Sequence, residues 1–333
     1  MHKGKKLRDA AKYAVLAAAY ASDGPREGTV VNPADVGGYR TKTVRAGEFL
    51  YISCYPLIGC SADREQRKRL EEFSADRQRI AKLREKYAKF NNKRRITEFE
   101  QLVHANMEKG DLHIACTYDL QDYDQYASVV FRTREDARKE IYNFLRRVKR
   151  LLKRNGCNLD VFRWICVTVT KESMKEAANP RPDAHHHHLL LHGAPQYLRN
   201  EIERLWPYGF CNADRLQDSE NGFAAVAGYV ARQESSVNGE NGGIRSFTTS
   251  RNIIRPRVTT SDSKISRRRA ALIAADVLVN GREIFEKKLF PGFRLVEDIR
   301  VTVSDYVAGA YIYAKLRRKP ASARKQRCRH MRN

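Results

Sequence analysis

Four consecutive histidines, His185 to His188, are the residues of this chain whose type and spacing point most directly to chemistry. Three leucines, Leu189 to Leu191, follow at once, which indicates a buried strand. Because side chains alternate between the two faces of a strand, His186 and His188 are expected to point together while His187 points away. Imidazole is a common ligand of divalent metals, so the pair could hold one ion.

A tyrosine on a predicted helix could act with such an ion. The helix spans Asn221 to Gln233, and Tyr229 lies on the flank of its apolar stripe, with Arg232 one turn later. A phenol is a poor nucleophile at neutral pH, since its reference pKa is about 10. A metal that polarises a phosphate lowers this demand, and the Arg232 cation could steady the charge. The stripe consists of Phe223, Val226, Ala227 and Val230.

Two imidazoles do not complete a metal site. A carboxylate or a side-chain amide should supply a third ligand and leave positions open for phosphate and water. Glu172, just after the adjacent strand, is the first candidate, and Asp183 is the second. A structural role remains the competing interpretation for the histidines, and most of the 16 tyrosines of the chain are expected to be packing residues.

The elements that must position these residues follow from hydrophobic periodicity. Strands are predicted at 112–118, 161–170, in the histidine run and at 209–213, with helices after Thr133 and over 196–206. This β-α-β-β-α-β order, followed by a helix, is typical of a ferredoxin-like unit with helices on one face and the other face free. We therefore predict an α+β fold. The core face of the first helix should comprise Ala137, Ile141, Phe144, Leu145, Val148, Leu151 and Leu152.

The composition favours a polyanionic partner. The formal net charge is +24 and the sequence pI is about 9.9, which makes nucleic acid the first expectation, ahead of a ribosomal or membrane-surface role. Between Arg64 and Phe90 apolar residues recur at helical spacing among dense charges. We predict four regions: a basic helical region over 1–105, a domain over 106–256 that contains the histidine run and Tyr229, an α/β extension over 257–314, and a disordered basic tail over 315–333.

Several function classes are disfavoured. The seven cysteines are odd in number and scattered, which argues against a disulfide framework or a zinc finger. No apolar run approaches the ~20 residues of a membrane span, and the Ala-rich N-terminal stretch is equally consistent with an ordinary helix. No GxxxxGK[ST] motif occurs. We expect a soluble, intracellular protein with no membrane partner.

Three stretches resemble the motifs of the HUH-superfamily rolling-circle replication initiators. They are Lys109 to Tyr118, the RPDAHHHHLLL run over 181–191 and the GYVARQ helix over 228–233. The likeness is greatest to replication-associated proteins of phages, plasmids and integrative elements of Gram-positive bacteria. It continues through TTSRNIIRP over 248–256 and VSDYVAGAYIYAKLRRK over 303–319.

The resemblance implies an HUH endonuclease fold in which His186 and His188 bind Mg²⁺ or Mn²⁺ and Tyr229 cuts one DNA strand. The products would be a 5′-phosphotyrosine link and a free 3′-OH that primes a host polymerase, after a host helicase opens the origin DNA. The setting would be the cytoplasm of a bacterial host. Two positions depart from the family pattern: Arg232 stands where lysine is usual, and Glu172 lies beyond the end of its strand.

Two alternatives stay open at this stage. A relaxase or a single-tyrosine transposase would use the same chemistry on different DNA. A non-catalytic DNA-binding regulator would keep the fold without the reaction.

Overall fold

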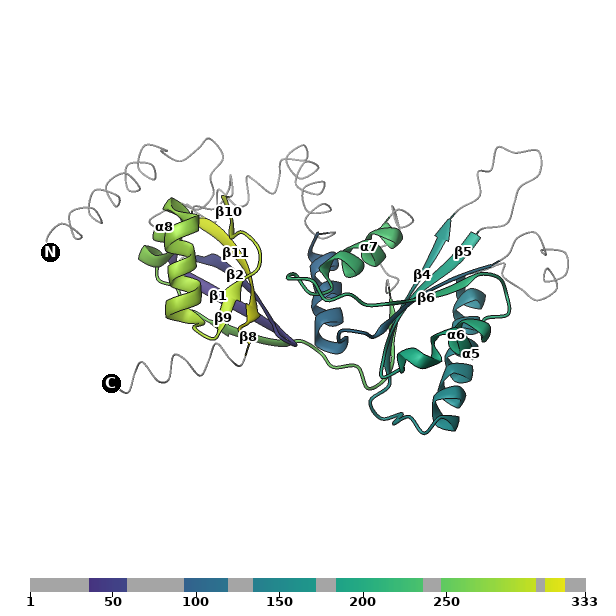
Figure 1. The fold of residues 1–333 in the computed structure, drawn as a ribbon. Helices are drawn as coiled ribbons and strands as arrows, with labels where there is room; N and C mark the ends of the chain where they lie inside the picture. The colour runs from purple at the N-terminus through teal and green to yellow at the C-terminus, as the bar shows by residue number, and fades with distance from the viewer. Residues whose placement is uncertain are drawn as a thin grey trace, which may run out of the picture. The chain divides into compact units, whose positions relative to one another are not determined.

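The computed structural model describes residues 36–58, 93–118, 134–171, 184–235, 247–303 and 309–320. The chain divides into two compact units (Figure 1): one comprises Lys89–Arg255, and the other combines Met1–Ala88 with Pro256–Asn333. We call them the histidine unit and the terminal unit. Each contains an antiparallel sheet with helices packed on it, which confirms the α+β class.

The histidine unit follows the predicted order of elements. From β3 to α7 its described elements follow in the order β-α-β-β-α-β and then a further helix, as the periodicity predicted. They are β3 (Leu112–Thr117), α5 (Arg134–Arg154), β4 (Arg163–Lys171), β5 (Ala184–His192), α6 (Arg199–Arg204), β6 (Cys211–Arg215) and α7 (Ala224–Ser235), with a short 3-10 turn, η3 (Gln196–Leu198), before α6 and a short strand, β7 (Thr248–Thr249), after α7.

The sheet of this unit places the histidine strand at its centre. The strand order is β6-β3-β5-β4-β7, and every pairing is antiparallel. His188 lies opposite Ala115 on β3 and Val167 on β4. Paired strands on both sides therefore fix the register of the histidine run.

One face of the sheet packs on α5 and α6 (Figure 1). Leu189 and Leu191 of β5 belong to this core together with Trp206. The seven residues predicted for the core face of α5 are all buried. The amphipathic pattern of that helix was therefore sufficient to assign its inner face.

The opposite face is not free, and the expectation of an open face was wrong. A helix over 93–106 and α7 pack on it (Figure 1). Val167 and Leu190 point to this side and are apolar, so leaving them in water would be costly. The helix over 93–106 covers them with Phe99 and Leu102.

The terminal unit is built on a second antiparallel sheet. The strand order is β10-β11-β2-β1-β8, and β9 pairs with β11. One helix, α8, and two π-helical segments, η4 and η5, pack on one face of this sheet (Figure 1). The elements are β1 (Val36–Ala46), β2 (Phe49–Ile58), β8 (Arg257–Ser261), α8 (Arg267–Ala275), η4 (Val277–Gly281), η5 (Glu283–Leu289), β9 (Phe293–Leu295), β10 (Arg300–Val303) and β11 (Ala310–Arg318).

The predicted helical region over 1–105 needs correction. Residues 36–58 form the hairpin β1–β2, turned by Gly47 at a φ of 55°, where glycine carries no steric cost. The boundary at 105 is also wrong, because the helix over 93–106 buries its apolar side on the histidine unit. The helix predicted from Arg64 to Phe90 lies outside the described residues.

The predicted C-terminal boundaries change as well. The extension over 257–314 is not a separate module, because β11 pairs directly with β2 of the hairpin. The basic tail does not begin at 315: β11 continues to Arg318, and Lys315 is only 5% exposed. Residues 321–333 of the predicted tail lie outside the described part of the chain.

Two further features concern membranes and thiols. Among the helices that the structure describes, none is both long and apolar enough to cross a bilayer. The cysteines within the described ranges are free thiols. Cys116 and Cys211, distant in sequence, lie opposite each other on β3 and β6 with their Sγ atoms 3.6 Å apart.

Candidate active site

His186 and His188 share the face of the sheet that α7 covers. Their ring centroids are 5.3 Å apart, and the ring of His188 lies 5.4 Å from that of Tyr229 on α7. A strand and a helix thus bring the predicted pair and the predicted nucleophile together. His188 is buried, whereas Tyr229 is 47% exposed and accessible to a large substrate.

His187 points to the opposite face, where α5 and α6 pack. Tyr118 Oη lies 2.8 Å from its Nε2, and Thr168 Oγ1 lies 3.0 Å from its Nδ1. Both ring nitrogens therefore have protein partners inside the core, as a structural histidine requires. His185 is also buried and falls on this face by strand alternation.

A third histidine that the motif analysis did not single out, His113, joins the site from β3. Its Nε2 lies 3.2 Å from Nδ1 of His188, and the two rings stack 5.4 Å apart. Burial lowers the pKa of His113. Asp214 on β6 lies directly opposite His113, and its negative charge partly offsets this lowering. Only the register of three strands brings these residues together, so the sequence alone gave no reason to select His113.

The contact with His113 bears on what His188 can bind. Burial, followed by the nearby His113 and His186, lowers the pKa of His188 to about 3, so its ring is neutral at pH 7. In the tautomer with the proton on Nδ1, His188 donates to His113 and its Nε2 carries a lone pair. That Nε2 is buried and has no hydrogen-bond partner. Such an atom suits a metal ligand whose second nitrogen is fixed by a neighbour.

Tyr229 is positioned by the packing of α7. Phe223, Ala227 and Val230 enter the core beneath it, as the apolar stripe predicted. The backbone N–H of Phe223, just before the helix, donates to Nε2 of His104 at 2.8 Å. The helix over 93–106 therefore holds the start of the helix that carries Tyr229.

Arg232 lies on the same helix and is exposed. Its guanidinium passes over Gly228, because a Cβ built at Gly228 would lie 3.2 Å from Nη1 of Arg232. Gly228 is therefore buried beneath this arginine. The glycine allows the Arg232 side chain to lie close to the helix axis on the turn that carries Tyr229.

The segment over 248–256 anchors the site rather than entering it. Asn252 donates through Nδ2 to the carbonyls of Asp160 and Phe162 at 3.0 and 3.1 Å. Asn106 accepts from the N–H of Ile254 and donates to its carbonyl, both at 2.8 Å. These bonds tie the segment to the loop before β4 and to the end of the helix over 93–106.

The predicted third ligands, Glu172 and Asp183, lie outside the described residues. Within the described ranges, no group of three or more His, Cys, Asp or Glu side chains is arranged to hold a metal. The residues present nevertheless fit part of a metal site, because imidazoles are the donor set and Nε2 of the neutral His188 is a buried acceptor without a partner.

Comparison with known proteins adds no further constraint. The chain matches no model of a known family, no curated protein and no solved structure. The inference about function therefore rests on the residues and on their geometry.

Proposed function

We propose that this chain is a metal-dependent, single-tyrosine DNA-nicking and strand-transfer enzyme of the HUH type that initiates rolling-circle replication. The observation that carries the proposal is the meeting of His186, His188 and Tyr229 on one side of the histidine sheet, with the rings of His188 and Tyr229 5.4 Å apart.

The fold supports the same proposal. The β-α-β-β-α-β connectivity and the antiparallel strand order β6-β3-β5-β4 are compatible with a ferredoxin-like unit, which is the fold we propose. An HUH endonuclease places its histidine pair on a central strand of such a unit, and β5 is central here. The helix α7 then supplies the tyrosine from across the same face.

The reaction follows from the phenol of Tyr229. Its oxygen attacks a phosphodiester phosphorus, and a bond forms between Oη and phosphorus while the bond from phosphorus to the 3′ oxygen breaks. The phenolic proton passes to solvent, and the leaving 3′ oxygen takes up a proton to give the free 3′-OH. The exposed Arg232 can steady the phosphate that becomes attached to Tyr229.

A bound Mg²⁺ or Mn²⁺ would polarise the scissile phosphate and ease departure of the 3′ oxygen. His186 and His188 would hold it, and a carboxylate from the 172–183 segment would be a suitable third ligand. His113 would fix the tautomer of His188 through their 3.2 Å contact.

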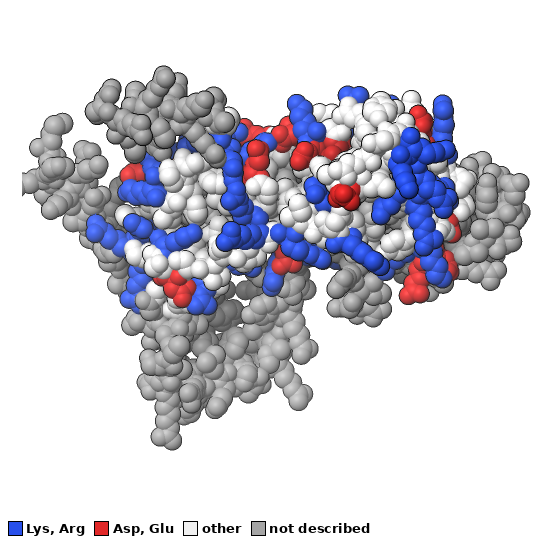
Figure 2. Space-filling model, turned by 90° about the horizontal axis from the view of Figure 1, so that it is seen from below, with Lys and Arg blue, Asp and Glu red and all other residues white. Residues whose placement is uncertain are grey.

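The surface charge supports a nucleic-acid substrate. Lys and Arg form extended bands on the face drawn in Figure 2, with Asp and Glu in smaller groups, as the net charge of +24 requires. Phosphate contacts of this kind give affinity that falls steeply with salt.

One observation favours a second candidate, a DNA-binding regulator without nuclease activity. Within the described residues, no group of three or more His, Cys, Asp or Glu side chains is arranged to hold a metal. A relaxase or single-tyrosine transposase would share the nicking chemistry and differ in the DNA it processes.

One experiment separates these candidates. The full-length chain is incubated with single-stranded oligonucleotides tiled over both strands of its own genetic element, with Mn²⁺ or with EDTA. We expect an SDS-resistant protein–DNA adduct with some tiles and Mn²⁺ only. Absence of an adduct on every tile contradicts the nuclease and supports the regulator, whereas the identity of the cleaved tile separates an initiator from a relaxase or transposase.

A further inference from the structure

The terminal unit presents a sheet face whose role the proposed nicking reaction does not explain. Alternate residues of β2 and β11, such as Ile52 and Ile312, point to the core beneath α8. Their neighbours in sequence, such as Tyr55 and Tyr313, must therefore point to the opposite face. Tyr313 confirms this orientation, because the Arg300 guanidinium on β10 lies over its ring at 5.8 Å.

This opposite face combines aromatic and basic side chains, and we call it the aromatic–basic face. The strand register places one transverse row of five residues across it: Thr260, Lys42, Ser53, Tyr313 and Arg300. An adjacent row begins with the pair of Arg40 and Tyr55 and includes the pair of Tyr311 and Thr302.

The tyrosines of this face are partly accessible. Tyr55, Tyr311 and Tyr313 all have intermediate exposure, and on β11 exposure alternates with burial from Ala310 to Ala314. Closer to the β1–β2 turn the same face is buried, and Lys315 lies 5.3 Å from the ring centre of Phe49. The accessible part is thus confined to the end formed by the two rows.

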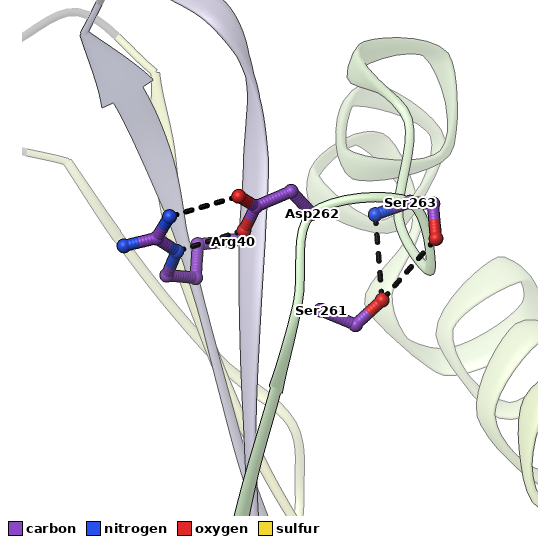
Figure 3. Close-up of polar contacts among 4 residues, drawn as sticks. All are labelled: Arg40, Ser261, Asp262 and Ser263. Carbon is purple, nitrogen blue, oxygen red and sulfur yellow. Dashed lines mark hydrogen bonds and ion pairs between the residues drawn. The ribbon is translucent and has the colours of Figure 1, made fainter.

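The basic residues differ in what already engages them. Arg40 donates from Nε and Nη2 to the two carboxylate oxygens of Asp262 at 2.7 and 2.8 Å (Figure 3), so its planar fork is committed within the unit. Lys42 on β1 and Arg300 on β10 lie in the first row, three strand spacings or about 14 Å apart. Arg300 is exposed and Lys42 is partly exposed.

We propose that the aromatic–basic face binds single-stranded nucleic acid, with bases stacked on Tyr55 and Tyr313 and phosphates held by Lys42 and Arg300. A base has a flat apolar surface that stacks on an aromatic ring irrespective of sequence. Duplexes keep their bases stacked inside, so only an unpaired strand offers this contact. A separation of about 14 Å between the cations matches a strand of about two or three nucleotides laid across the sheet.

The test measures binding without cleavage, so its outcome does not depend on the proposed nicking. The full-length chain carrying Tyr229→Phe is titrated in EDTA with fluorescent 12-mers of single-stranded DNA, RNA and duplex DNA, and anisotropy is recorded. Tyr313→Ala and Tyr55→Ala should each weaken single-strand binding by about 5- to 100-fold. Binding to duplex DNA should change little. The loss of affinity should be equal for single-stranded DNA and RNA, because base stacking does not depend on the sugar.

Two controls keep the test interpretable. Tyr197→Ala removes a tyrosine that is 70% exposed in the histidine unit and should leave binding unchanged. Tyr313→Phe keeps the ring and should bind like the parent, which separates lost stacking from misfolding. The combined Lys42→Gln and Arg300→Gln variant should lower the salt slope by about 1.4. The proposal is overturned if Tyr313→Ala and Tyr55→Ala bind single strands as Tyr197→Ala does, or if they weaken duplex binding by the same factor.

Discussion

The two sheets of this protein differ in what covers them. In the histidine unit both faces pack against helices, α5 and α6 on one side and α7 with the helix over 93–106 on the other. In the terminal unit α8, η4 and η5 pack on one face, and the other bears interleaved tyrosine, lysine and arginine.

This difference separates fixed chemistry from adaptable binding. A reacting group must be held within a fraction of an ångström, which paired strands and packed helices can provide. His188 has such a setting, with a strand on each side and Tyr229 above it. Stacking of bases tolerates variable geometry, so an aromatic–basic surface is sufficient for the terminal unit.

The largest effect expected is on nicking. His186→Ala or His188→Ala should lower the rate by about a thousandfold, because loss of the polarising ion removes about 4 kcal/mol of transition-state stabilisation. Single-turnover cleavage with Mn²⁺ measures it. Tyr55→Ala and Tyr313→Ala provide the contrast: they should weaken single-strand binding but leave the nicking rate at saturating substrate unchanged. Equal nicking rates for His188→Ala and the parent would show that a metal held by His188 takes no part in nicking.

A smaller effect is expected from the neighbouring histidine on the opposite face. His187→Ala removes the buried hydrogen bonds of His187 with Tyr118 and Thr168, at a cost of about 1–3 kcal/mol in unfolding free energy. Urea unfolding followed by circular dichroism measures this loss. Mn²⁺ affinity of the folded variant should stay at the parent value. A loss of metal affinity without a loss of stability would reverse the roles assigned to the two faces.

Substitution of His113 should lower the affinity for Mn²⁺ indirectly, through its contact with His188. His113→Ala removes the group that fixes the tautomer of His188 and should weaken Mn²⁺ binding by about 10- to 100-fold. Asp214→Asn, one step further away, should have a weaker effect in the same direction. Calorimetric titration with Mn²⁺ provides both values, and a larger effect at Asp214 than at His113 would contradict this order.

The smallest effect concerns pH in the absence of metal. The pKa of His188 is lower in the folded protein than in the unfolded chain, so the unfolded chain binds more protons between about pH 3 and pH 6.5. The contribution of His188 to the free energy of unfolding is largest above about pH 6.5 and decreases as the pH falls, by about 0.7 kcal/mol from pH 7 to 6. Unfolding in EDTA should show a shallower slope for His188→Gln, and a steeper slope would show that the sign is wrong.

The elements of the histidine unit were predictable because each one carries a hydrophobic periodicity that is local in sequence. The buried face of α5 and the β-α-β-β-α-β order follow from periodicity alone. Strand alternation was likewise enough to place His186 and His188 on one face and His187 on the other.

The terminal unit was not predicted, because its sheet joins residues far apart in the chain. β2 pairs with β11 across about 260 residues, as in Cys54 opposite Ile312, and no local pattern specifies that partner. The hairpin itself does have a signal in the sequence. Thr41 and Thr43 alternate before Gly47, which is a turn residue between two β-prone runs.

The most direct test of the central claim is to locate the covalent bond. An oligonucleotide that forms an adduct with Mn²⁺ is trapped, the protein is digested, and the modified peptide is sequenced by mass spectrometry. We expect a phosphotyrosine-linked nucleotide at Tyr229 and no adduct with Tyr229→Phe. The matched control Tyr197→Phe should give the same yield of adduct as the parent. A nucleotide attached to another residue, or an adduct that persists in Tyr229→Phe, would contradict it.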